Sequence, residues 1–145
     1  MFRYGRTMSI ICAFAIAHAF WLCPPAQAAH GLYEAEVQAH LCAGIEQEVH
    51  LGEMGRADCV STTHAIEIDW SEKWHEGLGQ VLAYATATGL RPGLVLVCRQ
   101  DEANCLRHSL AAQEVFSAQH LPATIWNCGT DAADLSDCRR VEVGK

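Results

Sequence analysis

The chain has few of the residues that build linkers, fibres or basic binding surfaces. Its 145 residues include only four prolines and 11 glycines, too few for a linker-like or collagenous chain. Hydrophobic residues make up 50% of the chain, which argues against disorder. The formal net charge is −7, so the surface as a whole is not built to attract nucleic acid. What remains is one globular domain, or one domain with a short processed segment.

Zinc-binding cysteine pairs and a second long apolar run are also missing. None of the eight cysteines forms a C-x-x-C pair, and the spacing Cys98-x6-Cys105-x2-His108 is not a usual set of zinc ligands. Residues 29–145 contain no further apolar run of membrane-spanning length, no internal repeat and no low-complexity tract. The sequence therefore disfavours a zinc site and shows no membrane span after residue 28.

The first 28 residues have the pattern of a signal peptide. A short basic start precedes an apolar run over residues 8–22, which is shorter than a membrane span of about 20 residues. Two prolines end the run, and Ala26-Gln27-Ala28 has the small-x-small pattern that signal peptidase accepts. We predict cleavage after Ala28, export to the periplasm or the extracellular space, and no membrane attachment afterwards. The alternative is an N-terminal membrane anchor.

Cleavage would leave six cysteines in an exported domain. Removing 28 of the 145 residues leaves 117, and the loss of two arginines changes the charge from −7 to −9. An even number of cysteines in an exported chain predicts disulfides, although sequence alone leaves the pairing open. The choice that closes the two shortest loops and leaves one further pair is Cys98 with Cys105, Cys128 with Cys138, and Cys42 with Cys59.

The spacing of apolar residues predicts the element order α-β-β-β-α-β-α-β. Helices are expected at 32–42, 71–88 and about 104–119, and strands at 48–51, 56–60, 64–69, 93–98 and 123–127. Short turns between the first three strands predict an antiparallel meander, and a strand-helix-strand unit predicts a parallel crossover. The fold class is therefore α/β with a mixed central sheet, stapled by disulfides, with a peripheral polar tail from about residue 129.

Three carboxylates fall on two neighbouring strands. Asp58 is on the second predicted strand, and Glu67 and Asp69 share one face of the third. Converging carboxylates repel one another, and a divalent cation such as Mg²⁺ relieves that repulsion through oxygen ligands. The plain alternative is an exposed acidic edge, with Asp69 capping the next helix.

The helix that follows carries a second polar group. Lys73, Gln80 and Tyr84 lie within about 40° of one another on a helical wheel. A separate, broad apolar side is expected to pack on the sheet and consists of Trp74, Leu78, Val81, Leu82 and Ala85. A cation, an amide and a phenol beside a metal site suit phosphate chemistry, whereas the alternative is an ordinary solvated face.

The pattern as a whole resembles the core of the PD-(D/E)XK nuclease superfamily. The motifs that carry the resemblance are Asp58, Glu67-Ile68-Asp69 and Gln80-Val81-Leu82-Ala83-Tyr84. The last motif is similar to the Gln-x-x-x-Tyr element of RecB-type nucleases, and the match covers about residues 34–127. The resemblance implies a restriction-endonuclease-like fold and hydrolysis of phosphodiester bonds in nucleic acid. Its implied cofactor is Mg²⁺, for which Mn²⁺ would substitute, with no organic cofactor.

The resemblance also assigns roles to single residues. The metal ligands are expected among the carboxylates Asp58, Glu67, Asp69 and Glu48, with Glu34 as the alternative to Glu48. In the superfamily, a lysine two residues after the glutamate positions the attacking water, but this chain has Asp69 there. Either Lys73, from the first turn of the next helix, takes that role while Gln80 and Tyr84 hold backbone oxygens of the substrate, or the site is inactive.

Three functions therefore stay open. They are an exported Mg²⁺-dependent nuclease, a catalytically inactive binding module of the same fold, and a disulfide-stapled structural or interaction protein. Of the ten Lys and Arg residues, two lie in the predicted signal peptide, so only eight remain to neutralise phosphates. Any binding of nucleic acid is expected to be weak and sensitive to salt.

The cysteine pairing gives the first test. In the oxidised, exported protein all six remaining cysteines should resist alkylation until a reductant is added, because each sulfur is held in a disulfide. Intact mass before and after reduction and alkylation checks this expectation. Free thiols at Cys42 or Cys59 would overturn the three-disulfide interpretation.

Overall fold

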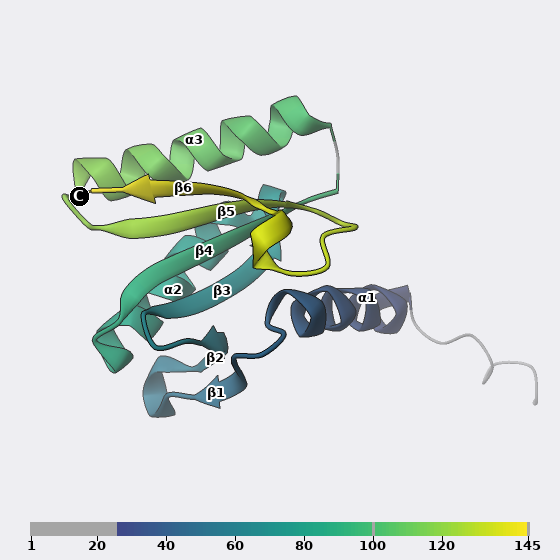
Figure 1. Cartoon of the computed structure of the whole chain (residues 1–145), viewed down its shortest axis with the longest axis horizontal. Helices are drawn as coiled ribbons and strands as arrows, with labels where there is room; N and C mark the ends of the chain where they lie inside the picture. Colours follow the sequence, from purple (N-terminus) through teal and green to yellow (C-terminus); the bar gives the residue numbers. More distant parts are fainter. Residues whose placement is uncertain (1–25, 100, 145) are drawn as a thin grey trace, which may run out of the picture.

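A mixed sheet of six strands forms the centre of the described chain and carries three α-helices (Figure 1). The computed structural model describes residues 26–99 and 101–144, without the side chains of 26–32. Most of the predicted signal peptide, with Cys12 and Cys23, lies outside the described residues. The predicted cleavage position falls within the first turn of the first helix.

The elements follow the predicted order and add one strand. The helices are α1 (Ala26–Leu41), α2 (Trp74–Thr88) and α3 (Glu102–Ala118). The strands are β1 (Glu46–His50), β2 (Arg56–Val60), β3 (His64–Trp70), β4 (Arg91–Cys98), β5 (Ala123–Gly129) and β6 (Arg139–Val143). Single 3-10 turns lie at Gly52–Met54, Ser71–Lys73 and Leu135–Asp137. The predicted α/β class and the order through β5 are confirmed.

The strands lie in the sheet in the same order as in the sequence, from β1 to β6. The pairs β1–β2 and β2–β3 are antiparallel, which confirms the predicted meander. The pairs β3–β4 and β4–β5 are parallel, because α2 and α3 connect them as crossovers. The sheet is therefore antiparallel where it begins and parallel at its centre.

The C-terminal segment differs from the predicted peripheral tail, because it contributes β6. This strand pairs antiparallel with β5 and forms one edge of the sheet. Val143 is 5% exposed and packs in the hydrophobic layer beneath α3, whereas Arg140 and Glu142 alternate onto the opposite face. The charged residues break up the apolar run, which is why periodicity alone did not reveal this short strand.

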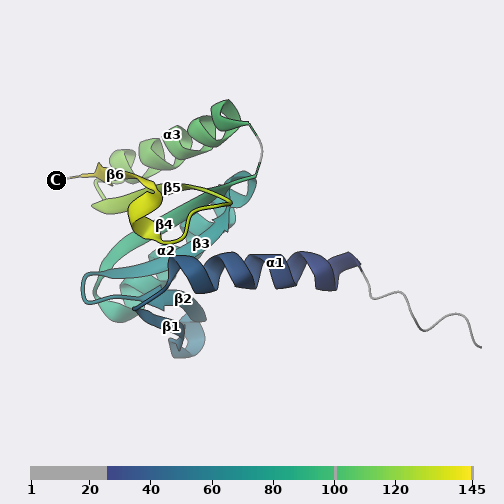
Figure 2. The ribbon, with the colours of Figure 1, turned by 45° about the vertical axis from the view of Figure 1, so that its right-hand side comes forward.

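Two hydrophobic layers cover the two faces of the sheet, and β4 belongs to both. Val95 and Val97 pack in the layer that includes Val37 and Leu41 of α1. Their neighbours in β4 face the opposite layer, which α2 and α3 complete. Figures 1 and 2 show the same arrangement, with α1 apart from the other two helices. The burial of β4 on both faces confirms the expectation from its apolar sequence.

Three disulfides staple the sheet to its surroundings, in the predicted pairs Cys42–Cys59, Cys98–Cys105 and Cys128–Cys138. The first joins the residue after α1 to β2, the second joins β4 to α3, and the third joins β5 to the residue before β6. Such a set is consistent with an oxidising location outside the cytoplasm. Among the described helices, none combines the length and the apolar character that a membrane crossing requires.

The buried face of α2 is centred differently from the predicted one. Its buried residues are Gly77, Val81 and Tyr84, whereas Trp74 and Leu78 are only half-buried. The helix also starts three residues later than predicted, after a 3-10 turn. Trp74 and Leu78 thus pack at the edge of the contact between α2 and the sheet, and Gly77 lies near its centre.

Gly77 explains how α2 comes so close to the sheet. A Cβ atom at this position would lie 2.9 Å from Leu94 Cδ1 and 3.5 Å from Asp69 Cβ. The absence of a side chain therefore lets the helix backbone rest directly on β3 and β4. This contact sets the depth at which α2 presents its other residues.

Gly77 and Gly79 form a matched pair for testing that contact. Gly79→Ala should stabilise the protein by about 0.5–1 kcal/mol, because helix propensity improves and nothing lies within 4 Å of the new Cβ. Gly77→Ala should instead destabilise it by about 1–3 kcal/mol, because the methyl group meets the buried Leu94 side chain. Chemical denaturation of the oxidised protein measures both changes. Equal effects would show that Gly77 is not a packing constraint.

Candidate functional site

The junction between β2 and β3 positions the first site residue. Within the β2–β3 ladder, only Cys59 and Val60 of β2 pair with β3. Just before them, Asp58 Oδ2 accepts a hydrogen bond from the Ile68 N–H at 2.8 Å. The carboxylate thus satisfies an amide that the backbone ladder no longer reaches. This bond fixes the Asp58 side chain at the point where the two strands separate.

Glu67 lies beside Asp58 on the neighbouring strand and is almost fully buried. It is 7% exposed, and its Oε2 atom has no hydrogen-bond partner among the described residues. Burial, together with the neighbouring charge of Asp58, raises the pKa of Glu67 to about 9. Burial also raises the pKa of Asp58 to about 6, although the bond from Ile68 opposes that shift. The junction therefore buries two carboxylates that share too few donors.

Both carboxylates line a pocket of about 450 Å³ that four elements share. Its lining consists of Glu34, Ala35 and Gln38 from α1, Glu48 from β1, Arg56 and Asp58 from β2, and Glu67 and Ile68 from β3. The pocket thus brings together Asp58, Glu67, Glu48 and Glu34 from among the predicted residues. The sequence left the choice between Glu34 and Glu48 open, and the fold places both at this pocket.

Glu34 and Glu48 differ in how far their charge is compensated. Glu48, at a left-handed φ of 53°, accepts a hydrogen bond from Gln38 Nε2 and pairs with the Arg56 guanidinium. Glu34 is half-buried, and its negative charge raises the pKa of both Asp58 and Glu67. Glu34 is therefore the better candidate to join these two residues in holding a cation.

Asp69 and Lys73 form a separate pair next to the pocket. Asp69 Oδ1 accepts a hydrogen bond from the Trp70 N–H at 2.8 Å, and Lys73 Nζ lies 3.7 Å from the same oxygen. Burial raises the pKa of Asp69 to about 6, while the Lys73 charge opposes the shift. Asp69 is absent from the lining of the pocket that holds Asp58 and Glu67. Its ion-pair partner is Lys73.

The predicted stripe on α2 divides between the interior and the surface. Tyr84 is 4% exposed, and burial together with the charge of Glu67 raises the pKa of Tyr84 to about 12. Gln80, one turn earlier, is exposed to solvent. The stripe lies on the boundary of the buried face, so Tyr84 lies beside Glu67 and Lys73 pairs with Asp69, while Gln80 faces solvent.

The pair Asp58–Glu67 fits a hard divalent cation, but the protein does not supply a full cage. Within the described part of the chain, no three His, Cys, Asp or Glu side chains are grouped to hold a metal ion. The four predicted ligands Asp58, Glu67, Asp69 and Glu48 are therefore not assembled around one point. Mg²⁺ commonly takes one or two carboxylates and fills its other positions with water or phosphate oxygens. The partnerless Glu67 Oε2 is an oxygen that such a cation would satisfy.

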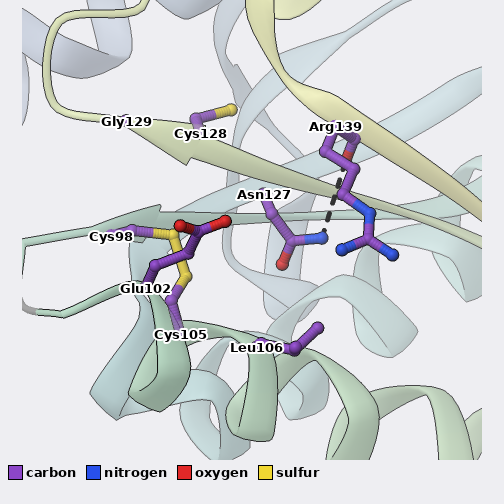
Figure 3. A pocket seen from close by; sticks show the side chains of 8 residues that line it. All are labelled: Cys98, Glu102, Cys105, Leu106, Asn127, Cys128, Gly129 and Arg139. Atoms are coloured by element: carbon purple, nitrogen blue, oxygen red, sulfur yellow. Dashed lines mark hydrogen bonds between the residues drawn. A yellow bond between two sulfur atoms is a disulfide. The ribbon is translucent and has the colours of Figure 1, made fainter.

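A second pocket, of about 340 Å³, lies at the C-terminal ends of β4 and β5 beside α3 (Figure 3). The Cys98–Cys105 disulfide forms one wall, and the Asn127 amide donates a hydrogen bond to the Arg139 main-chain oxygen at 3.5 Å. Glu102 and Arg139 line the pocket with opposite charges. None of the predicted catalytic or metal-binding residues lines this pocket, so the acidic chemistry belongs to the first one.

Two contributors to the site were not predicted from the sequence. Gln38 lies four residues after Glu34, and this helical spacing is the signal that places both on one side of α1. The Ile68 N–H orients Asp58, but every residue except proline has such an amide, so no sequence signal marks it.

Comparison with known proteins leaves the function to be argued from this site. The chain matched no protein-family model, no curated protein and no solved structure. The buried carboxylate pair, its unpartnered oxygen and the adjoining Asp69–Lys73 pair are the features that a function must explain.

The raised pKa of Glu67 predicts how stability depends on pH. Its carboxyl holds a proton up to about pH 9 in the folded chain but only to its ordinary value of 4.5 in the unfolded chain. The folded state binds the additional proton between these values, so the free energy of unfolding should fall as the pH rises through this window. Glu67→Gln mimics the protonated side chain. It should flatten the decline and stabilise the metal-free protein near pH 8 by up to about 5 kcal/mol.

Chemical denaturation across this pH range, with a chelator present, measures the effect. Glu36→Gln removes an exposed carboxylate from the same helix as Glu34 and should leave the pH dependence unchanged. Parallel pH profiles for the unmodified protein and Glu67→Gln would contradict the expectation.

Proposed function

We propose that the chain is an exported, metal-dependent phosphodiesterase that acts on nucleic acid and has a restriction-endonuclease-like fold. The observation that carries the proposal is the buried pair Asp58–Glu67, which lines a pocket and leaves Glu67 Oε2 without a partner. Burying two adjacent carboxylates destabilises a fold, and such sites are commonly retained because they bind or react. At this point the fold thus buries two carboxylates with too little positive charge beside them to compensate theirs.

The resemblance to PD-(D/E)XK nucleases supports the same proposal. The described chain contains an α-β-β-β-α-β succession, which agrees with the core of that superfamily. The residues carried over as metal ligands, Asp58 and Glu67, lie side by side on β2 and β3. Tyr84, from the Gln-x-x-x-Tyr element, packs against Glu67 from α2. These are separate pieces of the motif, and two of them, Asp58 and Glu67, line one pocket.

The residues of the pocket have distinct tasks in the proposed reaction. Asp58 and Glu67 would hold Mg²⁺ or Mn²⁺, with Glu34 of the pocket lining as the candidate to complete the site. When bound, such a cation polarises a phosphoryl oxygen and lowers the pKa of water. Lys73, whose side chain is 41% exposed, would orient that water or contact a phosphate oxygen from its place beside Asp69.

A catalytically inactive binding module is the second candidate, and one observation favours it. Asp69 occupies the position where the superfamily has its lysine, and it forms an ion pair with Lys73. A lysine held by this pair contributes less positive charge to a substrate than an unpaired one. The two candidates therefore differ in catalysis and share the cation site.

The net charge limits how the proposed substrate binds. The mature chain is predicted to carry −9, because 17 acidic residues outnumber the eight basic ones that remain. Only Arg56 supplies a positive charge to the pocket lining itself. We therefore propose contacts to few phosphates and binding that weakens steeply with salt. The three disulfides support a periplasmic or extracellular site of action.

An activity assay with matched variants tests the proposal. The oxidised protein should cleave DNA or RNA with Mg²⁺ or Mn²⁺ present and lose that activity to a chelator. Glu67→Gln should lower the cleavage rate by about 100-fold, the scale expected when one transition-state contact is removed. Glu36→Gln, an exposed change outside the pocket, should leave the rate unchanged.

Thermal denaturation with and without the cation separates the candidates. Cleavage with a cation-induced stabilisation supports the nuclease, and the stabilisation should disappear in Glu67→Gln. Stabilisation without cleavage of either nucleic acid would favour the inactive binding module. If the protein shows neither cleavage nor cation-induced stabilisation, both candidate functions are wrong. A disulfide-stapled structural protein would then remain.

A further inference from the structure

The helix that carries Glu34 and Gln38 is held by few buried contacts. Among the described side chains of α1, only Val37 and Leu41 are buried. Tyr33 is 43% exposed and stacks on Trp70 with a centroid separation of 5.6 Å. Figures 1 and 2 both show α1 extending past the sheet and away from α2 and α3. Packing alone therefore secures α1 weakly.

Electrostatic repulsion also acts against the docked position of α1. Glu34 of α1 lines the same pocket as Asp58 and Glu67, so like charges from the helix and from the sheet repel one another there. Opposing this, the Gln38 amide donates a hydrogen bond to Glu48 across the pocket. Without a cation, the helix is thus pushed away from the pocket that it helps to form.

The Cys42–Cys59 disulfide is placed to resist that repulsion. Cys42 follows the last residue of α1, and Cys59 follows Asp58 in β2. Both cysteines are 0% exposed, and their Cα atoms lie 5.9 Å apart. The bond therefore ties the helix that supplies Glu34 directly to the strand that supplies Asp58. Gln47 Nε2 adds a hydrogen bond to the Cys42 carbonyl oxygen at 3.2 Å.

We propose that this disulfide is a redox latch for the acidic pocket. The inference rests on the proposed function: the cation site is assembled when the bond forms, and the chain stays inactive while it is reduced. In forming the bond, the two thiols give up two protons and two electrons to a disulfide-donating oxidant, which leaves as two thiols. Because the sulfurs are buried, the latch closes during folding in an oxidising compartment and is protected afterwards. A nuclease of this kind is harmless to nucleic acid in the reducing cytoplasm where it is made.

The Cys98–Cys105 disulfide offers a matched control. It also closes a short loop, but it joins β4 to α3 and lines the second pocket (Figure 3). Removing it changes the number of crosslinks without releasing α1. A general loss of stability would follow from either deletion, whereas release of the helix follows only from the first.

The experiment compares the oxidised protein with Cys42→Ala/Cys59→Ala and with Cys98→Ala/Cys105→Ala. Hydrogen exchange of the α1 amides at residues 34–41 and calorimetric titration with Mn²⁺ are measured on each. The first variant should exchange these amides at least tenfold faster and bind Mn²⁺ at least tenfold more weakly. Amides of β3, β4 and β5 should remain protected, which shows that the core is folded. The second variant should match the unmodified protein in both readouts.

A third variant adds Glu34→Gln to the Cys42→Ala/Cys59→Ala background. Neutralising Glu34 removes its repulsion, so protection of α1 should return in part, which a merely structural crosslink does not predict. If the β3–β5 amides also lose protection, exchange of α1 in the unmodified protein during stepwise reduction gives the same comparison.

Exchange at α1 decides the latch, and Mn²⁺ binding by the unmodified protein decides the proposed function. Unchanged α1 exchange in the first variant overturns the latch even where Mn²⁺ binds. Faster α1 exchange in a protein whose unmodified form binds no Mn²⁺ supports the tether and overturns the metal site.

Discussion

At the junction of β2 and β3 the chain buries carboxylates that repel one another. The groups that contact these carboxylates each reduce part of that repulsion or of the cost of burial. The Ile68 amide takes one oxygen of Asp58, Tyr84 packs against Glu67, and Lys73 offsets Asp69. Each contact relieves part of the cost of burial, yet Glu67 Oε2 stays without a donor in the described chain. A buried carboxylate oxygen that lacks a donor beside a second buried carboxylate is where function is expected.

A second polar cluster at the other end of the parallel strands shows what a structural network looks like in this protein. His64 Nε2 and Thr124 Oγ1 lie 2.8 Å apart, and Thr124 donates to Glu142, which forms an ion pair with Arg91 at 3.0 Å. There, the one carboxylate accepts a hydrogen bond and meets a guanidinium, although Arg91 Nε has no hydrogen-bond partner among the described residues. The cluster around Glu67 gathers acceptors instead. The contrast argues that the acidic pocket is shaped for something the chain itself does not supply.

Much of this arrangement could be predicted from local sequence, but how closely its elements pack on one another could not. Alternation in β3 places Glu67 and Asp69 on one face, and the apolar run of β4 marks a strand buried on both sides. The separation of β2 from β3 and the close approach at Gly77 depend on contacts between distant residues. Periodicity therefore treated Tyr84 and Gln80 alike, although only one of them is buried. The short strand β6 was missed because its charged residues conceal its two inward valines.

Under the proposed function, the acidity of the protein has a thermodynamic consequence. A predicted charge of −9 and a pocket lined by four carboxylates repel phosphate until a cation is bound. Cation and nucleic acid then favour each other's binding, and the coupling free energy must be the same in both directions. An acidic exported chain of this kind would consequently not bind nucleic acid where divalent cations are scarce. Net charge thus argues against general affinity for nucleic acid and leaves room for affinity that depends on the cation.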